Sequence, residues 1–232
     1  MKTHLAAAVS AAALALLASS VAGAQQAEKT YLQQGVPAPK SALELTVATG
    51  YSQGFGLLRS GLGVPDVARA GMGFEAGAGY RINPNWGLAL NGQYQELLAE
   101  RAGSARGITP AFAVQYHIDP QTRLDPWLEL GTGYRFLWEV NRQDNSPTAL
   151  YHGWQMVRGR VGFDVRVSPE LAFSPVIGAD ATMFLYQDQG TNVAIRDPTV
   201  STFIFAGVQG RIDVLGTSVG TATVTSAQPE WD

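Results

Sequence analysis

Bulky apolar residues alternate with small, polar or charged residues along most of this chain. In the segment WLELGTGYRFLWEV, residues 127–140, Leu128 and Phe136 fall on one side of an extended strand, whereas Glu129 and Arg135 fall on the other. The alternation recurs over residues 43–55, 72–82, 86–95, 108–118, 127–140, 157–167, 171–185 and 204–214. A period of two in these segments predicts eight β-strands.

The connections between the predicted strands alternate between long and short. Long polar loops occupy residues around 56–70, 97–107, 141–153 and 187–199, and the others are the shorter turns NPN, DPQTRLDP and SPE. This alternation is typical of an up-and-down meander of antiparallel strands, with both ends of the strand region at the short-turn end. The eighth strand is the least regular, because Phe203 and Phe205 fall on its polar side.

Two kinds of barrel fit eight such strands. A soluble lipocalin-type barrel has an apolar lumen, whereas an outer-membrane barrel has an apolar band against lipid and a polar interior. The apolar side carries Leu, Ile, Val, Phe, Tyr and Trp, and the polar side mixes small residues with long charged ones. Because the interior of an eight-stranded barrel is only wide enough for side chains to fill, columns of large apolar residues would crowd it. We therefore predict an all-β fold, an eight-stranded antiparallel up-and-down transmembrane β-barrel with a polar, charge-paired lumen.

Acidic and basic residues on the polar side nearly balance, and the bases are all arginine, which forms bidentate pairs with carboxylates. Buried charges need partners, so these groups are expected to pair. The predicted lumen charge network consists of Glu44, Glu75, Arg81, Glu129, Arg135, Glu139, Arg158, Arg160, Asp164, Arg166, Asp180, Arg211 and Asp213. We expect Glu139 to face Arg158 and Glu129 to face Arg166 on neighbouring strands. The apolar side carries one charge within a strand, Glu96, near a long loop.

Aromatic residues occur near both ends of the predicted strands. Trp and Tyr prefer the interface between membrane and water, where their rings meet the lipid headgroups. The predicted aromatic girdle consists of Trp86, Trp127, Tyr80 and Tyr116 toward the short-turn end, and of Trp138 and Trp154 toward the long-loop end.

The first residues, MKTHLAAAVSAAALALLASSVAGA, combine an early lysine, an apolar run and a final small-x-small site. This pattern predicts a secretory signal peptide over residues 1–24 that is cleaved off. A flexible periplasmic lead-in is expected over residues 25–41, the barrel over 42–214 and a polar tail over 215–232. The chain has no cysteine, so its stability does not depend on disulfides. Its net charge of −3 gives no reason to expect a nucleic-acid partner.

The repeated Gly-x-Gly-Tyr strands GAGYRINPNWGLAL and ELGTGYRFLW, the tight turns INPNW and VSPEL, and the leader together resemble a known superfamily. It is the small eight-stranded outer-membrane β-barrel superfamily of Gram-negative bacteria, which includes OmpA-like, OmpX-like, OmpW-like and opacity-type proteins. The resemblance covers about residues 42–214. It implies a porin-like barrel in the cell outer membrane, a monomer surrounded by lipid and lipopolysaccharide and inserted by the barrel-assembly machinery. Such barrels usually end on an aromatic residue, whereas here the eighth strand ends near Val214 and a tail follows.

The residues that commonly carry catalysis are sparse. His117 is expected in the lumen near Asp119, and His152 in an exposed loop. A His–Asp pair can act as a general base, but without a nucleophile or metal ligand at a recognisable spacing a paired structural histidine is expected. The sequence contains no metal-ligand spacing, phosphate loop or nucleophile elbow, so no catalytic residue, metal or cofactor is predicted.

The resemblance implies two non-catalytic functions. The first is a structural or surface-interaction barrel, whose lumen is closed by the Arg/Glu/Asp pairs and whose long loops meet an extracellular ligand at the cell surface. The alternative is a narrow channel or lateral-exit route for small hydrophobic molecules, as in OmpW-like members. Gly178, Thr182 and Phe184 support the alternative, whereas Glu139 and Arg158 at a similar height oppose it. The closed barrel is favoured, because an eight-stranded lumen is nearly full.

Overall fold

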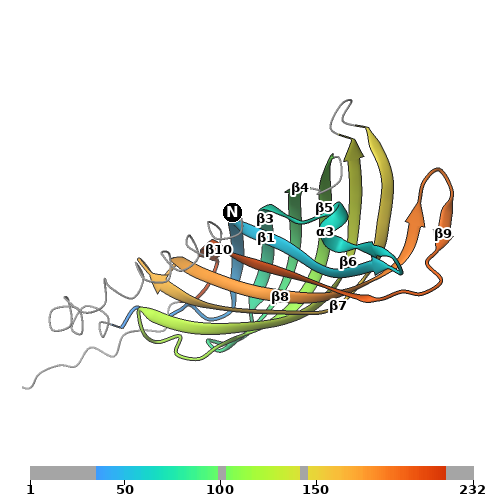
Figure 1. Cartoon of the computed structure of the whole chain (residues 1–232). Helices are drawn as coiled ribbons and strands as arrows, with labels where there is room; N and C mark the ends of the chain where they lie inside the picture. Colours follow the sequence, from blue (N-terminus) through green and yellow to red (C-terminus); the bar gives the residue numbers. More distant parts are fainter. Residues whose placement is uncertain (1–34, 99–102, 142–145, 218–232) are drawn as a thin grey trace, which may run out of the picture. The chain divides into compact units, whose positions relative to one another are not determined.

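The computed structural model describes residues 35–98, 103–141 and 146–217. Eight long strands form the barrel, and two short strands and one helical turn lie in the connections (Figure 1). The long strands are β1 (Ala42–Arg59), β3 (Ala70–Arg81), β4 (Trp86–Leu98), β5 (Gly103–His117), β6 (Leu124–Asn141), β7 (Pro147–Arg166), β8 (Leu171–Asp188) and β10 (Val200–Val214). The short elements are β2 (Leu62–Gly63), α3 (Val64–Val67) and β9 (Asn192–Ala194).

Each long strand pairs antiparallel with the next, and the last strand closes the sheet on the first. The closing β1–β10 ladder runs from Leu43 opposite Val214 to Gly56 opposite Ser201. On its other edge β10 pairs with β8. The predicted closed up-and-down barrel of eight antiparallel strands is therefore confirmed, and its long strands run from Ala42 to Val214.

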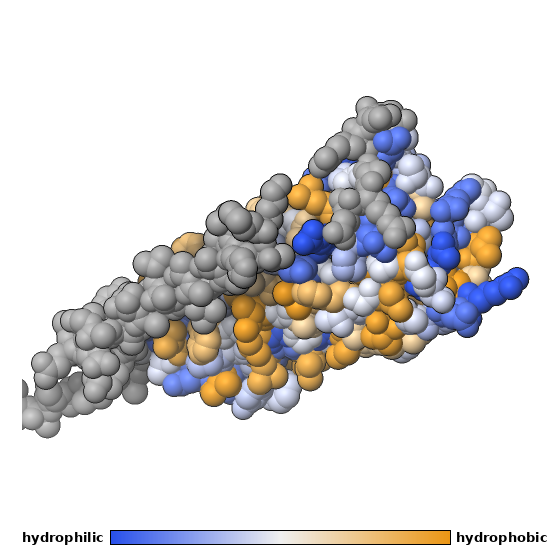
Figure 2. Space-filling model, in the orientation of Figure 1, coloured by the Kyte–Doolittle hydropathy of each residue, from blue (hydrophilic) through white to orange (hydrophobic). Residues whose placement is uncertain are grey.

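The alternation along the strands separates the barrel into an apolar exterior and a polar interior. On the outside, Val47 is 66% exposed and Leu130 is 58% exposed, whereas the inward-facing Arg81 and Arg211 are fully buried. Figure 2 shows apolar residues spread over the strands of the visible face, with hydrophilic residues gathered toward one end. An exterior of bulky apolar residues around a polar lumen is the arrangement that lipid surroundings require. The predicted orientation of the two faces is confirmed.

In the part of the chain that the structure describes, no helix is long and apolar enough to span a membrane.

Strand β7 contains a β-bulge that shifts its alternation by one residue. Gly131 of β6 pairs with Arg158, but Gly133, two residues on, pairs with Gln155, so Met156 is the extra residue. Both Gln155 and Arg158 consequently face inward and are buried, although they differ in parity. The bulge therefore changes which residues face the lumen in the half of β7 that approaches the long-loop end.

A second irregularity lies in the facing part of β8. His152 pairs with Tyr186 and Gly153 pairs with Phe184, so Leu185 is the extra residue. Phe184 is therefore buried in the lumen, while Tyr186 is exposed on the outside. The two bulges together give the long-loop half of the lumen a different lining from the short-turn half.

Candidate functional site in the lumen and at the loop rim

The short-turn end of the lumen holds a buried cluster around His117. The Nε2 atom of His117 lies 2.8 Å from Nη1 of Arg211 and 3.3 Å from Nη2 of Arg81. Arginine has donors only, so Nε2 accepts, Nδ1 carries the proton, and Nδ1 donates to Oδ2 of Asp125 at 2.7 Å. His117 is therefore a neutral, structurally paired histidine. Its carboxylate partner is Asp125, whereas Asp119, the predicted partner, donates its backbone N–H to Asp125 Oδ1 at 3.2 Å.

Three side chains in this cluster, those of His117, Asp125 and Asp164, offer ligand atoms within 4.8 Å of one another. Both ring nitrogens of His117 already have partners. Asp164 accepts from Nη1 of Arg211 at 2.9 Å and from the hydroxyl of Ser174. Because the guanidinium group of Arg211 contacts both His117 and Asp164, these residues form an ion-paired cluster and do not suit a metal cation.

Two further ion pairs complete the cluster. Nη2 of Arg81 lies 2.5 Å from Oε1 of Glu44, and Nη1 of Arg166 lies 2.8 Å from Oδ2 of Asp213. All four side chains are buried. Their alternating charges allow each desolvated ion to face an opposite one, which is the condition for burying charge.

Trp127 lies inside this part of the lumen, so its predicted place in the girdle is wrong. It is 2% exposed, and the Arg211 guanidinium carbon lies 5.5 Å from its ring centroid. The indole fits against Gly162, where an added Cβ would lie 2.5 Å from the ring. Its sequence parity already indicated this position, because Trp127 and the inward-facing Glu129 fall on the same side of β6.

The middle of the lumen is crossed by a four-residue ion cluster. Glu75 on β3 accepts from Nη2 of Arg158 and from Nη1 of Arg160, both at 2.5 Å. Glu129 lies 3.4 Å from Nε of Arg158 and 3.8 Å from Nη1 of Arg160, and it accepts from Nε2 of Gln115 at 2.7 Å. In the closed strand order β3 and β7 lie on opposite sides of the barrel, so the Glu75 pairs span its diameter. A cavity of about 10 Å³ beside Arg158 and Arg160, about the size of one water molecule, adjoins this layer.

The two pairings expected between neighbouring strands are wrong. Arg158 contacts Glu75 and Glu129 instead of Glu139, and Glu129 lies opposite Arg160 instead of Arg166. Glu139 is partly exposed near the end of β6, where it lies opposite Ala149. The predicted inward orientation of the charged side chains holds. All the arginines of the predicted network are buried, and so are its other acids except Asp180, which is half-buried.

Arg135 forms the next layer toward the loops. Its Nη2 atom lies 2.9 Å from Oδ2 of Asp180, and its Nε donates to the hydroxyl of Thr109 at 3.1 Å. Its guanidinium carbon lies 3.8 Å above the ring of Phe203, a distance suited to a cation–π contact. Phe203 and Phe205, the irregular residues of the eighth strand, therefore face the lumen and pack against arginines.

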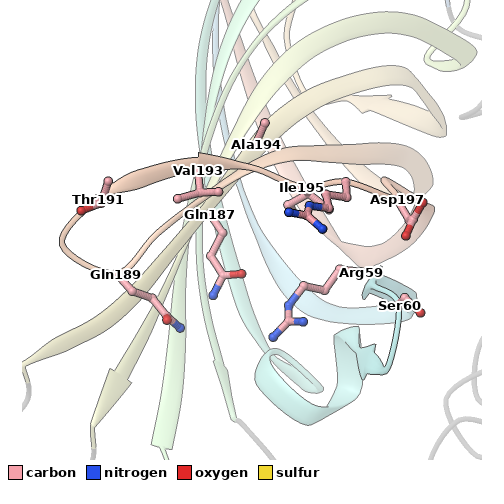
Figure 3. A pocket seen from close by; sticks show the side chains of 10 residues that line it. Arg59, Ser60, Gln187, Gln189, Thr191, Val193, Ala194, Ile195 and Asp197 are labelled. Atoms are coloured by element: carbon pink, nitrogen blue, oxygen red, sulfur yellow. The ribbon is translucent and has the colours of Figure 1, made fainter.

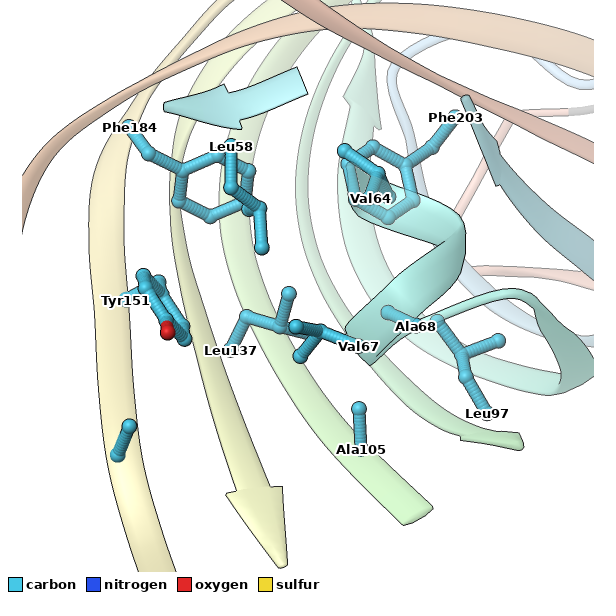
Figure 4. Close-up of a cluster of buried hydrophobic side chains, with 11 residues drawn as sticks. Leu58, Val64, Val67, Ala68, Leu97, Ala105, Leu137, Tyr151, Phe184 and Phe203 are labelled. Atoms are coloured by element: carbon cyan, nitrogen blue, oxygen red, sulfur yellow. The ribbon is translucent and has the colours of Figure 1, made fainter. Parts of the chain in front are cut away.

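Above Arg135 the lumen is filled by apolar side chains, and the helical turn α3 is part of the filling (Figure 4). Gly63, just before α3, donates its backbone N–H to the side chain of Asp66 at 2.9 Å. This apolar cap consists of Leu58, Val64, Val67, Ala68, Leu97, Ala105, Leu137, Ala149, Tyr151, Phe184 and Phe203. The loop at residues 56–70 was predicted to be polar and external, but its apolar residues at 58, 64 and 67 turn inward. The three-residue spacing of Val64 and Val67 was the available signal.

A short segment crosses the opposite, short-turn mouth of the barrel. Lys40 forms an antiparallel bridge with Thr217, just beyond β10. Two residues earlier, the backbone N–H of Ala38 donates to the carbonyl of Pro120 at 2.8 Å. Pro120 lies in the β5–β6 turn, across the barrel from β1. We call residues 38–41 the strap; they are held at both ends, although a flexible lead-in was expected there. The predicted signal peptide and most of the predicted tail lie outside the described residues.

The other predicted girdle residues lie on the outside of the barrel. Trp86 packs on Tyr116 with ring centroids 4.7 Å apart, and Tyr80 is exposed near the same end. Toward the loops, Trp154 is exposed and Trp138 is half-exposed. These positions agree with two aromatic belts.

His152 lies within β7 and faces outward, so its predicted place in an exposed loop is wrong. Its Nδ1 atom lies 2.8 Å from the hydroxyl of Tyr134, and its ring stacks on those of Phe136 and Tyr186. The extension of β7 back to Pro147 shortens the expected loop and places His152 in the outer aromatic belt.

A closed eight-stranded barrel with an apolar exterior, aromatic belts and an ion-paired lumen defines a transmembrane β-barrel protein. Comparison of folds gives the more particular class, because the chain has the fold of the small outer-membrane barrels. It is similar to the Neisserial surface protein A, at 13% identity and a TM-score of 0.52, over 73% of this chain and 96% of that one. A weaker similarity is found to the N-terminal β-barrel domain of Pseudomonas aeruginosa OprF, at 12% identity and a TM-score of 0.44, over 78% and 99% of the two chains. No protein-family model matches the sequence, and no curated protein matches it either. The chain therefore has the fold of an eight-stranded transmembrane β-barrel.

Proposed function

We propose that this protein is a non-catalytic, non-conducting barrel that serves a structural or surface-interaction role through its long loops. The observation that carries the proposal is the ion cluster of Glu75, Glu129, Arg158 and Arg160, whose pairs of 2.5 Å cross the full diameter of the lumen. Opposite walls in direct contact leave no continuous path for a hydrated solute. The apolar cap above this layer and the strap below it add two further obstructions.

Conductance of the refolded protein in planar lipid bilayers tests the proposal. We expect no steady single-channel currents from the wild-type protein. A quadruple variant, Glu75→Ala and Arg158→Ala with Val64→Ser and Val67→Ser, removes the pair that spans the lumen, loosens the cap above it, and is expected to conduct more than the wild type. Large, steady wild-type currents would contradict a closed lumen.

The alternative, a narrow route for small hydrophobic molecules, is favoured by one observation. The long-loop half of the lumen is lined by apolar residues, among them Leu97, Leu137 and Phe184, and α3 fills this space. Loosening α3 with Val64→Ser and Val67→Ser, and measuring the entry of a small hydrophobic dye into proteoliposomes, tests it. Under our proposal neither the wild type nor this variant speeds dye entry, because the charged layers lie below the cap.

The proposed surroundings follow from the two faces of the barrel. The apolar exterior and aromatic belts suit contact with lipid and lipopolysaccharide, insertion by the barrel-assembly machinery, and exposure of the long-loop end to the cell exterior. The protein should fractionate with outer membranes and should migrate differently on gels before and after heating. Recovery as a soluble periplasmic protein would contradict this placement.

A further inference from the structure

A groove of about 440 Å³ lies at the long-loop rim, between the end of β1 and the connection that contains β9 (Figure 3). Gln187, at the end of β8, and Arg59, at the end of β1, project into the space beside this connection. The lining residues are Arg59, Ser60, Gln187, Gln189, Thr191, Val193, Ala194, Ile195, Arg196 and Asp197. This volume falls within the range of pockets that bind small ligands.

The two arginines of the groove differ from the other arginines in the described part of the chain. Six arginines are paired inside the lumen. Arg69, Arg106 and Arg123 also have interaction partners. Among the arginines of residues 35–98, 103–141 and 146–217, only Arg59 and Arg196 have side chains without a hydrogen-bond or ion-pair partner, and both line this groove. The barrel pairs its other described arginines but leaves these two guanidinium groups available in the lining of one groove at its loop end.

The walls of the groove are fixed to the barrel and do not depend on a ligand for their position. Ile195 packs against the apolar cap, and its backbone N–H donates to the carbonyl of Leu185 at 2.8 Å. The hydroxyl of Thr199 donates to the carbonyl of Leu57 at 2.6 Å, which joins the connection to the end of β1. A site that is ordered before binding loses less conformational entropy when the ligand arrives.

We propose that this groove binds an acidic saccharide through its carboxylate, an inference that rests on the surface-interaction role proposed above. A planar guanidinium group matches the two oxygens of a carboxylate, and two such groups lie in the groove. The amides of Gln187 and Gln189 and the hydroxyl of Thr191 offer partners for sugar hydroxyls. The exposed side chain of Val193 offers an apolar contact for the face of a sugar ring. Asp197 is the one acid of the lining, so the groove carries a net positive charge.

Calorimetry on the refolded full-length protein in detergent micelles, with tri-galacturonate as the probe and maltotriose as its neutral counterpart, tests the proposal. We expect binding of tri-galacturonate and none of maltotriose. Arg59→Gln and Arg196→Gln should each weaken the affinity at least about tenfold, because each removes a charge-assisted hydrogen-bond partner. Asp197→Asn should strengthen it, because it removes the only negative charge of the lining.

The matched control is Arg123→Gln, which makes the same change of charge at the short-turn end of the barrel and should leave the affinity unchanged. Equal losses of affinity in the three arginine variants would overturn the assignment of the groove as the binding site, since they would show that the ligand is attracted by the net charge of the protein alone. The proposal that the ligand is an acidic saccharide would be overturned if the wild type failed to bind tri-galacturonate or bound inorganic phosphate equally well. Conductance is measured separately on the same preparations, so a conducting barrel that still binds would refute the closed lumen while leaving the groove assigned.

Discussion

Glu75→Gln is the sharpest test of the ion cluster in the middle of the lumen. The substitution keeps the size of the side chain and removes one charge. In the native barrel Glu75 and Glu129 balance Arg158 and Arg160, and all four side chains are buried. After the substitution two buried guanidinium groups share one carboxylate, which lies at the longer distances of 3.4 Å and 3.8 Å.

Removing one partner of a buried ion pair typically costs about 3–5 kcal/mol, because the remaining ion stays desolvated without compensation. Glu129 remains close enough to compensate in part, so we expect a loss of about 3 kcal/mol in the free energy of unfolding. The double variant Glu75→Gln with Arg158→Gln restores a neutral cluster. It should therefore be more stable than Glu75→Gln alone by about 1 kcal/mol or more.

Denaturant unfolding in lipid vesicles, followed by tryptophan fluorescence, measures these differences. Glu96→Gln is the matched control, because Glu96 forms an exposed pair with Arg106 at 3.7 Å on the outside of the barrel. An exposed pair contributes about 0–1 kcal/mol. If Glu75→Gln costs no more than Glu96→Gln, the cluster does not hold the barrel together and the reasoning from burial is refuted.

Three further predictions concern the two ends of the lumen. His117→Phe removes the acceptor shared by two arginines and should lower the free energy of unfolding by about 2 kcal/mol, whereas an unchanged unfolding midpoint would show that these hydrogen bonds do not stabilise the barrel. Val67→Asp places a carboxylate in the apolar cap and should release α3, so limited proteolysis should cut near residues 60–69 faster than in Val67→Ala. Ala38→Pro removes the N–H that donates to Pro120, so hydrogen exchange at Lys40 should speed up while the barrel amides keep their protection. Unaltered exchange at Lys40 would show that the strap does not depend on this bond.

The strands, their number and the direction of each face follow directly from the sequence, because a period of two can be read residue by residue. Arg81 and Arg211 are buried and Val47 is exposed as the alternation requires. The positions of lumen charges could be predicted for the same reason. Trp127 shows that the alternation must be applied to every residue of a strand. Its position in the alternation, and not its aromatic character, places it in the lumen.

The partners of the lumen charges could not be predicted, because contacts across a barrel depend on strand stagger and side-chain reach. Glu75 meets arginines from the opposite wall, and no local pattern relates β3 to β7. The bulge at Met156 hid the inward direction of the first half of β7. The inward position of α3 was not predicted, because its loop contains only a few apolar residues among glycines and charged residues. The groove at the rim brings together Arg59 and Arg196, which are far apart in the chain.

The bridge between Lys40 and Thr217 brings the two ends of the strand region side by side, so the barrel is nearly a continuous ring of chain. Joining the chain there by a short linker and reopening it elsewhere would preserve the hydrogen-bonded ladders between the long strands. Gly61 is a suitable opening, because its φ of 78° marks a turn and an added Cβ there would touch nothing. Such a circular permutant would place both chain ends at the loop rim. The barrel could then present a fused peptide from a scaffold whose interior is unchanged.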